Sequence, residues 1–270
     1  MILASDIPLN LWLGLPTAAA YALTALIGPR VAPAMGHRLL AVPWALHGLG
    51  LVFALFAPQD GAVRFGFAPA LSVTAWLMLT FYVLEQHWFP QLKTRWTLAS
   101  VGAAAVMLAS LFPGSALHMQ ASPWLPLHLA LGVASYGLIA AAVVHAWLMM
   151  RAEKSMRQGA DAHVGLPLLT LERLTFRFVS AGFVLLTATL AAGWLFGDSL
   201  YGAQAAWRWD HKTVFSLLAW CTFAVLLVGR SRFGWRGRKA VRVLYAGTLL
   251  LLLGYAGSRF VLEVVLGRVA

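Results

Sequence analysis

Long apolar stretches alternate with short polar or Gly- and Pro-containing segments along this chain. Each apolar stretch approaches the ~20 residues that an α-helix needs to cross a bilayer. Because backbone groups in hydrocarbon must be hydrogen-bonded within their own segment, each stretch predicts a transmembrane α-helix. The pattern predicts eight spans, of which the fourth is among the shortest: 9–28, 39–57, 66–85, 96–112, 124–150, 174–197, 213–229 and 241–258.

The composition supports an all-α, polytopic membrane helix bundle. Of the 270 residues, 61% are hydrophobic and only 11% are charged, against about 25% charged in soluble domains. The first apolar stretch lacks a basic leader and a small-residue cleavage site, so we interpret it as an uncleaved span. We therefore predict a single integral membrane domain over residues 1–270.

The single cysteine, Cys221, lies within a predicted span. No internal disulfide can form, and no CxxC or CxxCH motif occurs. These absences exclude a thiol oxidoreductase and a covalent c-type haem carrier.

The basic residues are distributed unequally between the two sides of the predicted bundle. Fifteen of the 20 Lys and Arg residues lie in the loops 29–38, 86–96, 151–177 and 230–242, and five lie on the other side. The positive-inside rule places these four loops in the cytoplasm and both termini on the periplasmic, outer side. The net charge of +11 is then explained by topology and lipid headgroups, so we expect the lipid bilayer as a partner and no nucleic acid.

A tryptophan-rich outer loop, 198–212, is predicted between the sixth and seventh spans and ends in WRWDHK. Trp207 and Trp209 form either a flat binding surface or a pair of interface anchors, since indole is apolar with one N–H donor. Asp210 precedes an apolar run and is predicted to cap the next helix.

Four histidines occupy informative positions. His118, His128 and His211 are all predicted near the outer face. His47 lies near the middle of the second span, where a polar side chain is costly and indicates function. A hydrogen bond from His47 to a neighbouring helix is the alternative.

The fifth span places small residues beside a histidine. At 100° per residue, His128, Gly132 and Ser135 share one narrow sector of the helix, and Tyr136 lies about 80° away. This face predicts a groove for a planar, apolar ligand. Helix packing through small residues is the competing interpretation.

The W-x-W-D-x-K pattern, followed by a helix containing FSLLAW, resembles the signature of the cytochrome c assembly family of haem-handling proteins of the CcsA and CcmC type. Trp220 matches the tryptophan that follows the signature, and the helix with His128 and Tyr136 matches the family's histidine-bearing helix. The chain is most similar to the small inner-membrane branch called YpjD-like, through His118 and His128 around A-S-P and a repeated Y-A-G.

This resemblance implies a multi-pass protein of the bacterial inner membrane that presents non-covalent, b-type haem at the outer face. In the family, the aromatic loop covers the porphyrin edge, two outer histidines bind iron, and histidines within helices are linked to haem passage. The iron ligands implied here are His128, His118 and His211, and the wider cofactor-binding set adds Trp207, Trp209, Asp210, His47 and Tyr136.

Two departures affect the ligand set. The family's second outer histidine follows the last helix, where this chain carries Arg259 and no histidine. The family's proline after W-x-W-D is His211 here, and its acidic residue is Thr213. His118 or His211 can substitute as the second ligand, or the branch has lost haem and kept the scaffold.

These features favour a haem-handling protein of cytochrome c biogenesis that works with other biogenesis proteins. The alternative is a haem-free membrane scaffold or transporter subunit. HExxH, GxSxG and Gly-rich phosphate motifs are absent from the sequence, so we expect a binding protein rather than an enzyme.

Overall fold

A computed structural model gives the fold of the protein. It describes residues 9–31, 33–56, 63–88, 96–116, 122, 124–158, 167–197 and 209–267.

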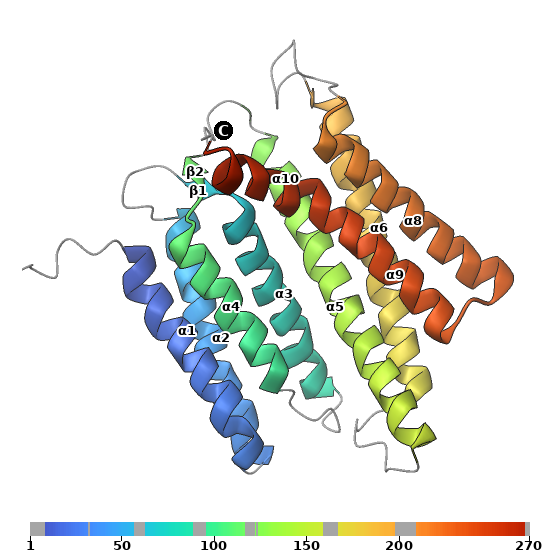
Figure 1. Ribbon diagram of the computed structural model, residues 1–270, viewed down its shortest axis with the longest axis horizontal. Helices are drawn as coiled ribbons and strands as arrows, with labels where there is room; N and C mark the ends of the chain where they lie inside the picture. Colours follow the sequence, from blue (N-terminus) through green and yellow to red (C-terminus); the bar gives the residue numbers. More distant parts are fainter. Residues whose placement is uncertain are drawn as a thin grey trace, which may run out of the picture. The chain divides into compact units, whose positions relative to one another are not determined.

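Eight main helices run through the described residues, one for each predicted span (Figure 1). Their bounds are α1 Leu9–Ile27, α2 Pro33–Phe56, α3 Phe67–Trp88, α4 Trp96–Leu111, α5 Leu125–Arg157, α6 Leu168–Leu195, α8 His211–Phe233 and α9 Gly237–Leu252. A short turn of 3-10 helix, η2 (Gly28–Arg30), follows α1. After α9 the chain stays helical through η4 (Leu253–Gly257), α10 (Ser258–Phe260) and η5 (Val261–Val265).

Seven of these helical segments are long and apolar enough to cross a membrane. The exception is α4, which has 16 residues and so measures about 24 Å at 1.5 Å per residue. This is shorter than the ~30 Å hydrocarbon layer. The fourth prediction is therefore confirmed as a helix, and the other seven also as candidate spans.

Several helices extend beyond their predicted limits. The helix α5 continues to Arg157 rather than 150, and α6 begins at Leu168 rather than 174. The predicted polar loop 151–173 is thus wrong over much of its length. Helical hydrogen bonding continues past the apolar window by which a span is detected, because charged residues such as Lys and Glu are good helix formers.

The all-α prediction misses one small sheet. Strand β1 (Arg64–Phe65) pairs antiparallel with β2 (Ser115–Ala116), joining the segments before α3 and after α4. Gly114 precedes β2 with φ of 79°, and a Cβ there would lie 2.6 Å from the Phe65 carbonyl carbon. Only glycine fits such a position, so Gly114 permits this close approach.

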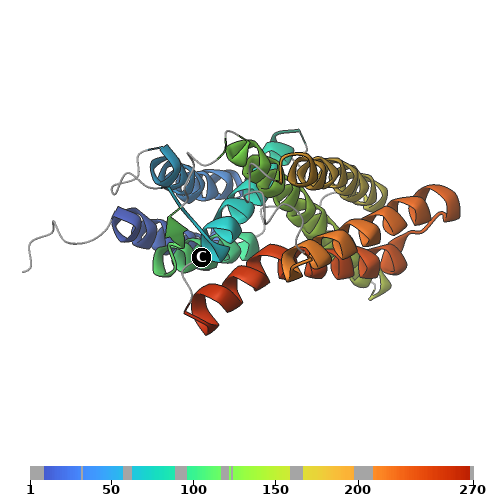
Figure 2. The ribbon, with the colours of Figure 1, turned by 90° about the horizontal axis from the view of Figure 1, so that it is seen from above.

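Contacts divide the chain into two compact units. Unit 1 comprises residues 1–84, 94–118 and 259–270, and unit 2 comprises residues 85–93 and 119–258. In unit 1, α1 packs on α4 and α2. In unit 2, α5 packs on α6 and α8 packs on α9, as Figure 2 shows from above. The single membrane domain stays a prediction.

The helices of unit 2 alternate in direction, so their termini form two distinct ends. One end gathers the start of α5, the end of α6 and the start of α8 (Figure 1). The opposite end carries the turn between α8 and α9, where Gly234 takes the left-handed conformation with φ of 62°. We call these the aromatic end and the basic end of unit 2, and each carries one of the sites described below.

Candidate functional site

His128 lies in the first turn of α5 and faces α6. A Cβ added to Gly193 of α6 would lie 3.4 Å from the His128 Cε1 atom. The Nδ1 atom of His128 is buried. The imidazole edge therefore packs against α6 at Gly193, where a methyl group would still make only ordinary van der Waals contact.

An aromatic pair closes the same end of these two helices. The rings of Trp124 and Phe196 are stacked with centroids 4.2 Å apart and planes 8° apart. Trp124 immediately precedes α5, and Phe196 immediately follows α6. The pair was missed in the sequence, although two aromatic residues at the same predicted membrane face are a signal for it.

Asp210 caps α8 as predicted. Its carboxylate accepts a hydrogen bond of 2.8 Å from the backbone N–H of Thr213. Because α8 begins at His211, the predicted loop 198–212 is wrong at its end: His211 and Lys212 belong to the helix. Within the described residues, Trp209 is 70% exposed and His211 is also exposed.

The start of α8 lies near His128. Lys212 is within electrostatic range of the His128 imidazole, and its ammonium lies 5.8 Å from the ring centroid of Tyr255 in η4. The aromatic end therefore combines α5, α6, α8 and η4. His128 and the segment Trp209–Lys212 share one end of unit 2, whereas His118 and Trp207 lie outside the described residues.

The predicted groove beside His128 is wrong below the first turns of α5. Ser135 is fully buried and donates a hydrogen bond of 3.0 Å to the Gly182 carbonyl of α6. A Cβ on Gly132 would lie 3.6 Å from the Thr189 methyl group. Small residues here bring α5 and α6 close together, which is the competing interpretation of helix packing.

Tyr136 is also engaged within unit 2. Its hydroxyl donates a hydrogen bond to the backbone carbonyl of Leu251 in α9. This bond links α5 to the last turn of α9, just before the π-helical segment η4 begins. Its predicted contact with a cofactor stays a prediction.

His47 lies in unit 1 and is 3% exposed. Its Nε2 atom is 2.8 Å from the Ser72 hydroxyl of α3, and its Nδ1 atom is 3.4 Å from the Tyr21 hydroxyl of α1. The structure thus supplies the hydrogen bonds to neighbouring helices that were the alternative for this residue. A role in haem passage stays a prediction.

A second buried histidine was missed as a candidate. His145 Nε2 lies 2.6 Å from a carboxylate oxygen of Glu85, which belongs to the same unit, and both side chains are almost fully buried. The His145 Nδ1 atom is 2.8 Å from the Ala141 carbonyl. The signal was an acidic residue, Glu85, at the last position of a predicted span; a carboxylate near the hydrocarbon is costly unless it is paired.

Within the part of the chain that the structure describes, no three His, Cys, Asp or Glu side chains gather as a metal site. Of the three predicted iron ligands, only His128 and His211 fall in that part. At the aromatic end the described donors are the imidazoles of His128 and His211, while the Asp210 carboxylate is engaged as the cap of α8; imidazole is a common ligand of haem iron.

Comparison with known proteins identifies related chains. The family model described as Cytochrome C assembly protein matches residues 39–266. Inner membrane protein YpjD of Escherichia coli (strain K12) is 32% identical over 163 residues, which are 58% of this chain and 60% of that protein. The Uncharacterized 28.8 kDa protein in nifR3-like 5'region of Azospirillum brasilense is 36% identical over 174 residues, 63% of each chain.

A more distant relative aligns over more of the chain. Cytochrome c biogenesis protein CcsA of Chlamydomonas reinhardtii is 26% identical over 243 residues, 84% of this chain and 68% of that protein. The chain spans only about 60% of the length of the YpjD relatives that it matches. No solved structure matches. The predicted multi-pass inner-membrane location is confirmed by the seven candidate spans and the inner-membrane relatives.

Proposed function

Because the chain belongs to the cytochrome c assembly protein family, we propose that it binds haem and presents it at the outer face of the inner membrane for cytochrome c biogenesis. One observation carries the proposal: His128, Trp209, His211 and Lys212 gather at the aromatic end of unit 2. The positive-inside rule puts this end on the outer side.

The residues at the aromatic end suit a haem ligand. His128 would supply one imidazole to the haem iron, because its ring lies in the first turn of α5 at this end, with its buried Nδ1 edge against Gly193. His211, or His118, supplies the second. When bound, haem supplies a ligand-sensitive iron centre, and the exposed indole of Trp209 offers an apolar plane for stacking.

Lys212 adds charge complementarity. Haem carries two propionates, and an ammonium forms charge-assisted hydrogen bonds with carboxylates. Lys212 is held beside Tyr255 by the first turn of α8, which Asp210 caps. The cap therefore positions both His211 and Lys212, while His47 and Tyr136 remain candidates for secondary contacts with haem.

The protein is proposed to bind and deliver haem rather than to catalyse a reaction. Its one cysteine, Cys221, cannot provide the pair of thiols that disulfide chemistry requires. Reduction of apocytochrome thiols and covalent attachment of haem are therefore assigned to partner proteins of the biogenesis system.

The test is an optical spectrum of the protein purified in detergent, oxidised and reduced. We expect a Soret band, and we expect His128→Ala to lose at least about nine-tenths of the haem per folded protein, because a proposed iron ligand would be removed. His37→Ala, on the predicted cytoplasmic side, is the matched control and should retain its haem. His211→Ala reports whether this residue is the second ligand.

A haem-free scaffold is the second candidate, favoured by the close packing of Gly132 and Ser135 on α6. It predicts a colourless protein that gains no Soret band when haem is added. It also predicts that His128→Ala and His37→Ala behave alike. Either result would overturn the haem proposal.

A further inference from the structure

A pocket of about 610 Å³ opens at the basic end of unit 2. Four arginines, one glutamate, one serine and two apolar side chains line it. They come from α6, from the end of α8 and from the turn before α9. None of these residues belongs to the aromatic end, so the pocket is independent of the proposed haem site.

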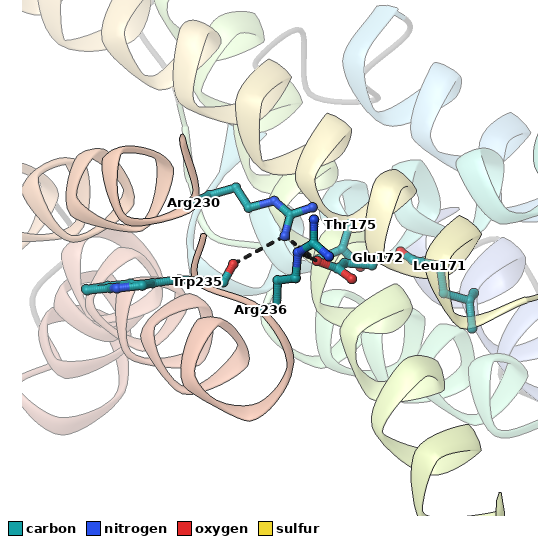
Figure 3. Close-up of polar contacts among 6 residues, drawn as sticks. All are labelled: Leu171, Glu172, Thr175, Arg230, Trp235 and Arg236. Atoms are coloured by element: carbon teal, nitrogen blue, oxygen red, sulfur yellow. Dashed lines mark hydrogen bonds and ion pairs between the residues drawn. The ribbon is translucent and has the colours of Figure 1, made fainter. Parts of the chain in front are cut away.

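One glutamate organises two of the arginines. Figure 3 shows Arg230 and Arg236 converging on Glu172. Arg230 donates a hydrogen bond to Glu172 and another, of 3.4 Å, to the Trp235 carbonyl, and its guanidinium lies 4.7 Å from the ring centroid of Phe176. Arg236 Nε lies 3.7 Å from the same carboxylate. Arg230 is thus a fixed part of the pocket wall.

The other two arginines are not paired with a carboxylate within the described residues. Arg173 and Arg177 are one turn apart on α6, both line the pocket and both are exposed. Glu172 neutralises one of the four positive charges, so the pocket keeps a net excess of three positive charges.

The pocket also has apolar walls. Leu169 is 69% exposed and lies one turn before Arg173, and Phe176 contributes an aromatic ring. From residue 178 onward, α6 is nearly free of charge. We therefore expect Arg173 and Arg177 at the level where the headgroup layer meets the hydrocarbon, since arginine side chains commonly lay their aliphatic stems along apolar surface there.

We propose that this pocket binds the phosphate of an anionic phospholipid headgroup from the inner leaflet. Arg173 and Arg177 hold the phosphate oxygens through guanidinium forks, which match phosphate geometry. Arg230, fixed by Glu172, supplies the back wall. Leu169 and Phe176 contact the start of the acyl chains, a role that a free phosphate ion would leave unfilled, and basic pockets between membrane helices suit such headgroups.

The experiment titrates the full chain in detergent with a short-chain phosphatidylglycerol and measures binding by native mass spectrometry. Short-chain phosphatidylcholine and inorganic phosphate are titrated in parallel. We expect phosphatidylglycerol to bind at least about fivefold more tightly than either. Arg173→Gln with Arg177→Gln should weaken its binding by about tenfold, since each basic residue contributes attraction near the surface.

Arg238→Gln with Arg242→Gln is the matched control. These two arginines are also one turn apart and exposed, on α9 at the same end, but they do not line the pocket. The control should bind phosphatidylglycerol within about twofold of the parent. Equal loss in both double variants, or equal binding of phosphatidylcholine, would overturn the proposal, and equal binding of inorganic phosphate would show a free-anion site instead of a lipid site.

Discussion

His47 in unit 1 and His128 in unit 2 are held in opposite ways. His47 is enclosed, with both ring nitrogens near hydroxyl groups from α1 and α3. His128 lies in the first turn of its helix, with one edge against a glycine and the start of another helix nearby. The comparison teaches that a histidine in or near a membrane span can lock helices together, as His47 does, or lie at a helix end where a ligand role can be proposed, as for His128.

The largest expected effect is on the stability of unit 1. His47→Leu leaves the Ser72 and Tyr21 hydroxyl groups buried without their partner, so it should lower the free energy of unfolding by about 2–4 kcal/mol. His128→Leu, at a half-buried position, should lower it by less than about 1 kcal/mol. Unfolding by SDS titration in mixed micelles measures both. If both variants lose the same free energy of unfolding, the proposed difference between a structural His47 and a less constrained His128 is wrong.

Glycines that pack near the two histidine sites, Gly102 and Gly193, provide the next comparison of stability. A Cβ on Gly102 would lie 2.9 Å from the Tyr21 ring, so Gly102→Val should cost about 1–3 kcal/mol through overpacking. In the same unit, Gly50 has nothing within 4 Å of its Cβ position, which makes Gly50→Val the control. Gly193→Ala should leave stability within about 0.5 kcal/mol and haem occupancy unchanged, because its Cβ would only reach ordinary van der Waals contact with the His128 ring.

The helix cap beside His128 should have a smaller effect. Asp210→Ala removes the bond to the Thr213 N–H and should destabilise the start of α8 by about 1 kcal/mol. Hydrogen exchange of the first turn of α8 measures this loss. Asp210→Ser, which keeps a capping oxygen, should restore protection. If Asp210→Ser does not restore this protection, the carboxylate acts through its negative charge rather than through the hydrogen bond.

The smallest expected difference in stability is between variants of Ser72 and Tyr21, the two hydrogen-bond partners of His47. The Ser72 contact is 2.8 Å and the Tyr21 contact is 3.4 Å, and hydrogen bonds weaken with length. Ser72→Ala should therefore cost about 1 kcal/mol, and Tyr21→Phe less than about 0.5 kcal/mol. The same SDS titration compares them, and the reverse order would make Tyr21 the main anchor of the imidazole.

The candidate site was predictable in part. The helix cap formed by Asp210 was predictable from the sequence alone, because a short acidic side chain directly before an apolar run accepts hydrogen bonds from the free N–H groups of the next helix. The position of His128 in the first turn of its helix followed from its place at the end of a predicted span. The Trp124–Phe196 stack, the contact of Lys212 with Tyr255 and the glutamate shared by Arg230 and Arg236 join residues from different helices, and no local rule pairs them.

Hydrophobic periodicity and composition determined the number of main helices and the membrane class, because the bilayer imposes its thickness on the sequence of every span, and the W-x-W-D-x-K motif with its flanking helices indicated the family. Only the tertiary structure decided which helix faces are filled. Gly132 and Ser135 left the choice between a groove and a contact open, and the structure resolved it because α6 brings Thr189 and the Gly182 carbonyl to meet them. Small residues permit close approach, but the neighbouring helix determines whether that space is occupied.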